Sequence, residues 1–108
     1  MKEFKITSNP IDSQTIGENS GIGARSVFEG TVRDINDGHI VTKLEYECYE
    51  PLAMKEGNKI LAEAIEKFGL IDAFCIHRIG TLEIGETAVI VVATGGHRDE
   101  AFKGCRYI

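Results

Sequence analysis

The sequence has few cysteines, and they lack the spacing of a metal site. Only Cys48, Cys75 and Cys105 occur among 108 residues, with no Cys-x-x-Cys pair and no Cys/His cluster. Structural zinc sites need four such ligands at short spacings, so no zinc module is predicted. An odd number of widely separated cysteines also argues against a complete disulfide framework. We therefore expect buried free thiols in a reducing cytoplasm.

Long apolar runs and a positive net charge are also missing. The N-terminal stretch MKEFKITSNP lacks the apolar centre of a signal peptide, and no apolar run approaches the roughly 18 residues of a membrane span. Twelve basic residues against 17 acidic ones give a net charge of −5, whereas general nucleic-acid binding needs a basic face. We expect neither a membrane nor a nucleic acid as a partner.

What is present suits one domain, residues 1–108, because the length is too short for two and 43% of the residues are hydrophobic. Its elements follow a mixed order of strands and helices, typical of an α+β domain with a mostly antiparallel sheet. The expected strands are 3–7, 25–34, 40–50, 71–80 and 86–95. The dipeptide Asp37-Gly38 is a hairpin signal that would pair the second strand with the third, and residues 81–86 would form the turn between the last two.

Helical periodicity predicts one long helix over residues 51–69. Pro51 suits its first turn, and Gly69 suits the left-handed residue that ends a helix. Its apolar stripe consists of Ala53, Gly57, Ile60, Leu61, Ala64, Ile65 and Phe68. A short helix could follow Asn9 and Pro10. A C-terminal helix is expected from residue 97, with one apolar face made of Ala101, Phe102, Cys105 and Ile108.

The stretch TGGHRDEAF, residues 94–102, has the chemistry of an anion site. It joins a buried strand to a helix, and a helix N-terminus offers free N–H groups and a partial positive charge. Gly95 and Gly96 allow a ligand to approach the backbone, and Arg98 adds a planar charge beside His97. The alternative is a loop in which Arg98 pairs with a neighbouring carboxylate. Sequence chemistry alone leaves both interpretations open.

Other candidates are weaker when each is taken alone. Arg33 ends a strand, where Asp34 could neutralise it at the surface. Within the strand FCIHRIG, we expect a structural His77 and a solvated Arg78. No Gly-x-Ser-x-Gly motif is present, and no cysteine is paired with a histidine as in nucleophilic catalysis.

Four stretches together resemble the large, catalytic subunit of molybdopterin synthase. In sequence order they are FEGTVRDINDG, LEYECYEPLAMKE, IHRIGTLEIGE and GGHRDEAFKGCRYI, and they lie between about Val27 and Ile108. The resemblance implies an α/β-hammerhead fold, a cytoplasmic homodimer and no metal or other cofactor. It also implies a small ubiquitin-like sulfur-carrier subunit at each end, giving a heterotetramer. The carrier's Gly-Gly C-terminus would bring a thiocarboxylate, whose sulfur converts cyclic pyranopterin monophosphate to molybdopterin.

The resemblance also assigns substrate-binding residues. Thr31, Val32 and Arg33 match the family's substrate-binding strand end, and His97 and Arg98 match a His-Arg pair that contacts substrate from the partner protomer. The pair would hold the phosphate of the pterin.

The family's catalytic lysines fall beyond Ile108, and Lys103 lies too early in the same helix to match them. We expect the protein to continue past Ile108 with these lysines. The alternative is a non-catalytic module that lacks them and only binds the carrier protein. An unrelated phosphate-binding domain, based on the GGHR stretch alone, is a third interpretation.

Overall fold

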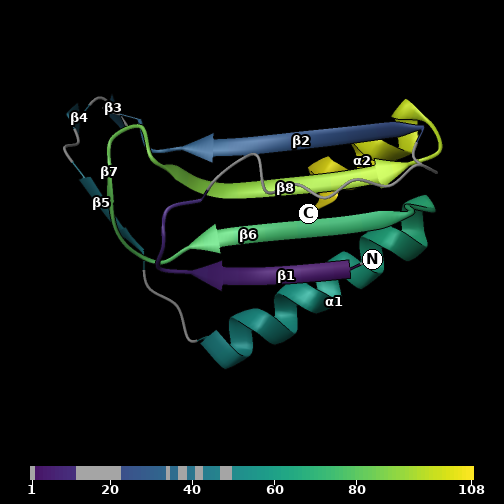
Figure 1. Ribbon diagram of the computed structural model, residues 1–108, viewed down its shortest axis with the longest axis horizontal. Coiled ribbons are helices and arrows are strands. Elements are labelled where there is room, and N and C mark those ends of the chain that lie inside the picture. Colours follow the sequence, from purple (N-terminus) through teal and green to yellow (C-terminus); the bar gives the residue numbers. More distant parts are fainter. Residues whose placement is uncertain (1, 12–22, 34, 37–38, 41–42, 47–49) are drawn as a thin grey trace.

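The computed structural model describes residues 2–11, 23–33, 35–36, 39–40, 43–46 and 50–108. Its centre is a four-stranded sheet with strand order β1-β6-β8-β2 (Figure 1). The bounds are Lys2–Thr7 for β1, Ala24–Thr31 for β2, Asp72–Arg78 for β6 and Thr87–Gly95 for β8. Only β1 and β6 run parallel, so the sheet is mostly antiparallel, as predicted.

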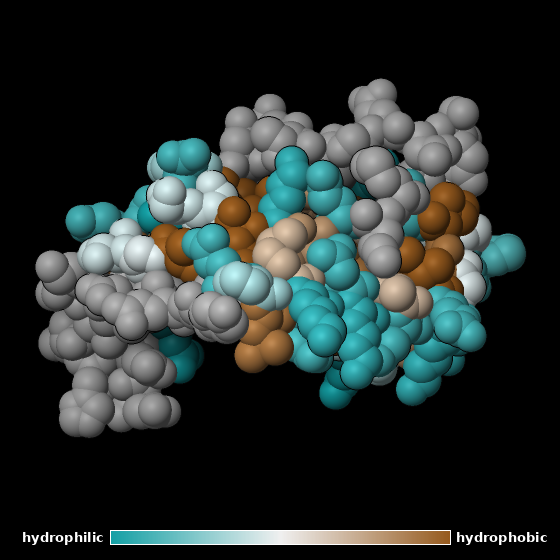
Figure 2. All heavy atoms as spheres, turned by 90° about the horizontal axis from the view of Figure 1, so that it is seen from below, coloured by the Kyte–Doolittle hydropathy of each residue, from teal (hydrophilic) through white to brown (hydrophobic). Residues whose placement is uncertain are grey.

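Both helices pack on one face of this sheet. Helix α1, Glu50–Phe68, lies over β1 and β6, and helix α2, Arg98–Tyr107, lies over β8 and β2. Alternate residues of the two central strands point toward the helices, because successive side chains of a strand face opposite ways. The resulting core consists of Leu61, Ala64, Leu70, Ala73, Cys75, Val91, Ala93 and Cys105. The opposite side of α1 carries exposed lysines and glutamates, and hydrophilic side chains cover much of the face seen in Figure 2.

The long helix agrees with its prediction to within one residue at each end. Gly57, Leu61 and Ala64 of the predicted stripe are buried, and the remaining stripe residues are half-buried. Gly69 has a φ of 65°, the left-handed conformation expected after a helix. Periodicity therefore identified both the helix and its buried face.

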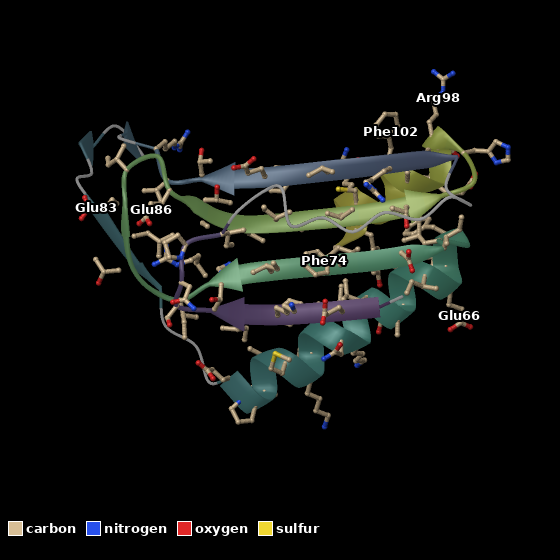
Figure 3. All side chains as sticks on the ribbon, viewed as in Figure 1. Glu66, Phe74, Glu83, Glu86, Arg98 and Phe102 are labelled. Carbon is tan, nitrogen blue, oxygen red and sulfur yellow. The ribbon has the colours of Figure 1, made fainter. Side chains whose placement is uncertain are left out.

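The C-terminal helix was predicted correctly, but one residue of its apolar face was not. Ala101 and Cys105 are buried, and Ile108 packs against the core. Phe102 instead points away from the sheet and is 62% exposed (Figure 3). The two helices contact each other near their C-terminal ends, where Tyr107 donates its hydroxyl hydrogen to Glu63 at 2.7 Å.

The predicted pairing of residues 25–34 with 40–50 is wrong. Strand β2 pairs along its whole length with β8, where α2 covers both strands. Residues on either side of the Asp-Gly signal do form a small ribbon, β3 (Ile35–Asn36) with β4 (His39–Ile40). Strand β5, Lys43–Tyr46, pairs with β7, Gly80–Glu83, so the first half of the predicted turn 81–86 is a strand and the reversal itself is confined to the residues after Glu83. Both ribbons lie at the end of the sheet where β2 ends (Figure 1).

The short helix predicted after Asn9 and Pro10 lies mainly outside the described residues, and residues 10 and 11 are not helical.

Candidate functional site

The strand end that carries Arg33 is held by two backbone hydrogen bonds. The pairing of β2 with β8 shifts register between Gly30 and Thr31. The next residue, Val32, is 3% exposed, donates its N–H to the carbonyl of Glu86 at 3.0 Å and accepts from the N–H of Gly85 at 2.8 Å. Thr31 and Arg33 on either side are exposed. This geometry presents Arg33 to solvent from a fixed backbone.

The turn that holds Val32 is braced by a buried arginine. Arg78 Nη1 donates to Glu86 Oε1 at 3.0 Å, and Glu86 Oε2 accepts the N–H of Glu83 at 2.7 Å. The Glu83 hydrogen bond, followed by the hydrogen bond and charge of Arg78, lowers the pKa of Glu86 against an opposing effect of burial. The prediction of a solvated Arg78 is therefore wrong, because its side chain is enclosed beside a carboxylate. His77 is half-buried, with Nδ1 2.7 Å from the carbonyl oxygen of Arg78.

The GGHR junction lies where β8 ends and α2 begins, as predicted. Gly23 donates its N–H to the carbonyl of Gly95 at 3.1 Å, and a Cβ on Gly23 would lie 2.0 Å from the Gly96 carbonyl oxygen. Only glycine allows this close approach of the two backbones. His97 donates its backbone N–H to Glu100 Oε2 at 3.1 Å, which satisfies one donor at the helix start.

The side chains of this junction are accessible. His97 is 86% exposed, with Nδ1 3.7 Å from Glu100 Oε1. Asp99 pairs with Lys103 at 3.0 Å rather than with Arg98, which makes no ion pair within the described part of the chain. Figure 3 shows Arg98 pointing away from the sheet. In the described residues the neighbouring carboxylates lie near Lys103 and His97, so neither of them neutralises Arg98 as the loop interpretation supposed.

One chain does not bring the predicted site residues together. The β2–β8 register places Ala24 opposite Gly95 and Thr31 opposite Thr87. Arg33 therefore lies at one end of β2, and His97 and Arg98 lie at the other. The eight residues of β2 span about 26 Å at a rise of about 3.3 Å per residue. A pocket containing all three side chains requires a second chain.

Strand β2 is an edge strand with an exposed apolar surface. It pairs only with β8 within the four-stranded sheet. Val27 and Phe28, at its midpoint, are 47% and 56% exposed, and Phe102 projects from the neighbouring helix α2. Apolar residues on an unpaired strand edge are typical of an association surface. This surface could not be predicted from the sequence, because the same residue types also fit a core strand.

A cavity of about 490 Å³ lies at the opposite edge of the sheet. Phe4, Lys5, Ile6, Thr7, Pro10, Ile11, Met54 and Ile76 line it. It contains none of the predicted site residues, and Lys5 already lies 3.7 Å from Glu3. Its mainly apolar lining does not provide an anion site.

The described thiols are not arranged for catalysis. Cys75 and Cys105 are buried and free, and burial, together with Cys105, raises the pKa of Cys75 to about 11. Cys48 lies outside the described residues. Within the described ranges, no group of three or more His, Cys, Asp or Glu side chains could hold a metal ion. No helix in the same ranges is long and apolar enough to cross a membrane.

Known proteins resemble this chain along most of its length. The family model described as MoaE protein matches residues 6–108. The molybdopterin synthase catalytic subunit of Pyrococcus abyssi is 46% identical over 89 residues, which are 82% of this chain and 60% of that protein. The protein of the same name from Bacillus subtilis is 40% identical over 110 residues, 99% of this chain and 70% of the relative.

The fold likeness is equally extensive. The crystal structure of molybdopterin synthase from Staphylococcus aureus has a TM-score of 0.89 at 37% identity, covering 99% of this chain and 80% of that one. The expected fold is therefore confirmed. The chain spans 60% of the Pyrococcus relative's length and 70% of the Bacillus relative's.

Proposed function

Because the chain belongs to the MoaE protein family, we propose that it is the catalytic subunit of a molybdopterin synthase. It transfers sulfur from the thiocarboxylate of a small carrier protein to cyclic pyranopterin monophosphate, in the biosynthesis of the molybdenum cofactor. Two sulfurs are needed for the dithiolene of molybdopterin, so two carriers are used per product. Water supplies the oxygen of each carboxylate left on a spent carrier.

The observation that carries this proposal is the extent of the family match. It includes both candidate segments, Thr31–Arg33 and Gly95–Arg98, and the relatives above are named catalytic subunits. That name also implies a further subunit, which favours the small ubiquitin-like carrier as partner. The buried free thiols agree with a reducing cytoplasm.

We assign phosphate binding to Arg33, His97 and Arg98. A guanidinium matches the geometry of phosphate oxygens, and the N-terminus of α2 favours an anion at the same place. Thr31 and Val32 shape the strand end, Val32 through its two backbone bonds. The overall net charge is −5, so the two arginines form a local exception to the charge of the molecule.

A homodimer through β2 would complete the site. Antiparallel pairing of two β2 edges about a twofold axis at Phe28 places Thr31 opposite the partner's Arg25, next to the partner's Ala24. Arg33 then lies near the partner's His97 and Arg98, because these follow the strand that pairs with Ala24. The exposed side chains at the strand midpoint are covered by the same pairing. Each dimer would contain two sites and take one carrier at each end.

The decisive experiment combines the full-length protein with thiocarboxylated carrier and cyclic pyranopterin monophosphate. Dithiolene product is expected, and carrier that ends in an ordinary carboxylate is the control that should give none. Absence of product, with intact folding and intact carrier binding, would contradict the enzyme proposal.

That last outcome would instead favour the non-catalytic carrier-binding module. The names of the relatives favour the enzyme. Lysines in a helix that continues past Ile108 would further favour the enzyme over the binding module. Failure to bind the carrier at all would point to the unrelated phosphate-binding domain.

A further inference from the structure

A buried arginine lies directly behind the segment that carries Arg33. Arg78 ends β6, is 5% exposed, and pairs with Glu86 at 3.0 Å. The other oxygen of Glu86 accepts the N–H of Glu83, and the N–H of Glu86 donates to the Glu83 carbonyl at 3.1 Å. One carboxylate therefore ties the end of β6 to both ends of the turn 83–86.

The same turn holds the residue before Arg33. The backbone carbonyl of Glu86 accepts from Val32, and Gly85 donates back to Val32. Glu86 thus contacts Arg78 through its side chain and Val32 through its backbone. A displacement of Glu86 would be transmitted to Arg33 through a single hydrogen-bonded residue.

Stability alone gives little reason for a charge at position 78. Replacing a buried ion pair by well-packed apolar residues is often neutral or stabilising, because both charges lose their hydration. Here the compensation is incomplete: within the described residues Arg78 Nε has no hydrogen-bond partner, and Nη2 reaches the carbonyl of Thr81 only at 3.5 Å. What the pair does provide is a directional link between strand end and turn.

We propose that Arg78, through Glu86, is a positioning residue that sets the place of Arg33 in the substrate site. The proposal rests on the function proposed above. Arg78 itself does not touch substrate. It fixes the turn against which Val32 is bonded, and so fixes the direction from which the Arg33 guanidinium meets an anion.

A double-mutant cycle in the full-length protein tests this role. Arg78→Met removes the guanidinium but keeps an apolar stem, and Glu86, which is partly accessible, can turn to water. With Arg33 present, we expect kcat/KM for cyclic pyranopterin monophosphate to fall about tenfold, mostly through KM. In an Arg33→Ala background the same substitution should change kcat/KM by less than about twofold, because the guanidinium that Arg78 is proposed to position is absent.

Two further variants keep the test independent of folding. Glu86→Gln retains the size of the side chain but removes its charge. Its amide NH2 group must then face either the Glu83 N–H or the Arg78 guanidinium, and both of these are donors. The variant should therefore reproduce the KM effect. Arg78→Lys should restore part of the loss. The control is Glu3→Gln, which removes a carboxylate from the exposed pair with Lys5 on β1 and should leave kcat/KM unchanged.

The possible outcomes are distinct. Equal losses with and without Arg33 would mean general structural damage and would overturn the positioning role, as would no loss when Arg33 is present. A wild-type protein that makes no dithiolene would refute the proposed function first, and this inference with it.

Discussion

The two arginines assigned to the site are held in different ways at the scale of single residues. Arg33 follows a residue with both backbone groups bonded, so its starting point is fixed. Arg98 is the first residue of α2, exposed and without an ion pair in the described ranges. The unpaired N–H groups of a helix start add their partial charge to that of Arg98. A bound anion would thus meet two sources of positive potential at one point.

Removing Arg98 should therefore weaken the substrate complex strongly. A charge-assisted hydrogen bond contributes roughly 1.5–3 kcal/mol, so Arg98→Ala should reduce affinity for cyclic pyranopterin monophosphate by about 10- to 150-fold. Arg98→Lys should recover only part, because a point charge lacks bidentate geometry. Calorimetric titration of the full-length protein measures both variants. An affinity within twofold of the wild type for Arg98→Ala would remove this residue from the site.

The described cysteines should be chemically unreactive, even though the proposed function is sulfur transfer. With a pKa of about 11, Cys75 is almost entirely a neutral thiol at pH 8, and the thiolate is the reactive form. Iodoacetamide at pH 8 should modify Cys75 and Cys105 only after unfolding, as mass spectrometry of the peptides can record. Cys75→Ala should leave sulfur transfer largely intact. Complete loss in a folded variant would reveal a persulfide or nucleophile.

At the scale of elements, the spacing between α1 and β1 depends on one glycine. Gly57 is buried in the middle of the helix, and a Cβ there would lie 2.6 Å from ring atoms of Phe4 on β1. Helix propensity alone would favour alanine at this position by about 1 kcal/mol. The close approach of helix and strand has the opposite effect, because neither backbone can retreat without disturbing the core.

Gly57→Ala should consequently destabilise the protein despite its better helix propensity. Overpacking costs typically about 1–3 kcal/mol, so after a propensity gain of about 1 kcal/mol we expect a net loss of up to about 2 kcal/mol in urea unfolding. Glu66→Ala, at an exposed position of α1, is the control and should change stability by less than about 0.5 kcal/mol. Adding Phe4→Leu should recover part of the loss. A stabilised Gly57→Ala variant would show that Phe4 moves aside freely.

Element by element, sequence reasoning succeeded where a pattern is local. The apolar stripe of α1 and its end at Gly69 depend only on residues close together in the sequence. The bounds of the helix were therefore predicted to within one residue. Strand partners are not local. The Asp-Gly signal correctly indicated a reversal of the chain, but nothing near it states that β2 pairs with β8, about 60 residues away. The burial of Arg78 was also missed, since its partner Glu86 lies in the turn after β7 and the turn's fold is needed to bring the two side chains together.

At the scale of the whole molecule, the unpaired edge of β2 should mediate dimer formation. Sedimentation velocity at micromolar concentration is expected to show twice the chain mass. Phe28→Lys places a charge at the strand midpoint, which natural edges use against pairing, and should shift the protein to monomer. Leu52→Lys is a matched control, because Leu52 is 54% exposed against 56% for Phe28 but lies on α1. A wild-type monomer, or a dimer unaffected by Phe28→Lys, would contradict this surface.

The position of the two arginines at opposite ends of β2 has a genetic consequence. In the proposed dimer each site would take Arg33 from one copy and Arg98 from the other. A copy carrying Arg33→Ala and a copy carrying Arg98→Ala, each strongly impaired as a homodimer, would form a mixed dimer in which one site has both defects and the other has none. Random mixing makes about half of all dimers mixed, so about a quarter of the sites should regain activity. Two alleles that fail separately would then complement each other when expressed together.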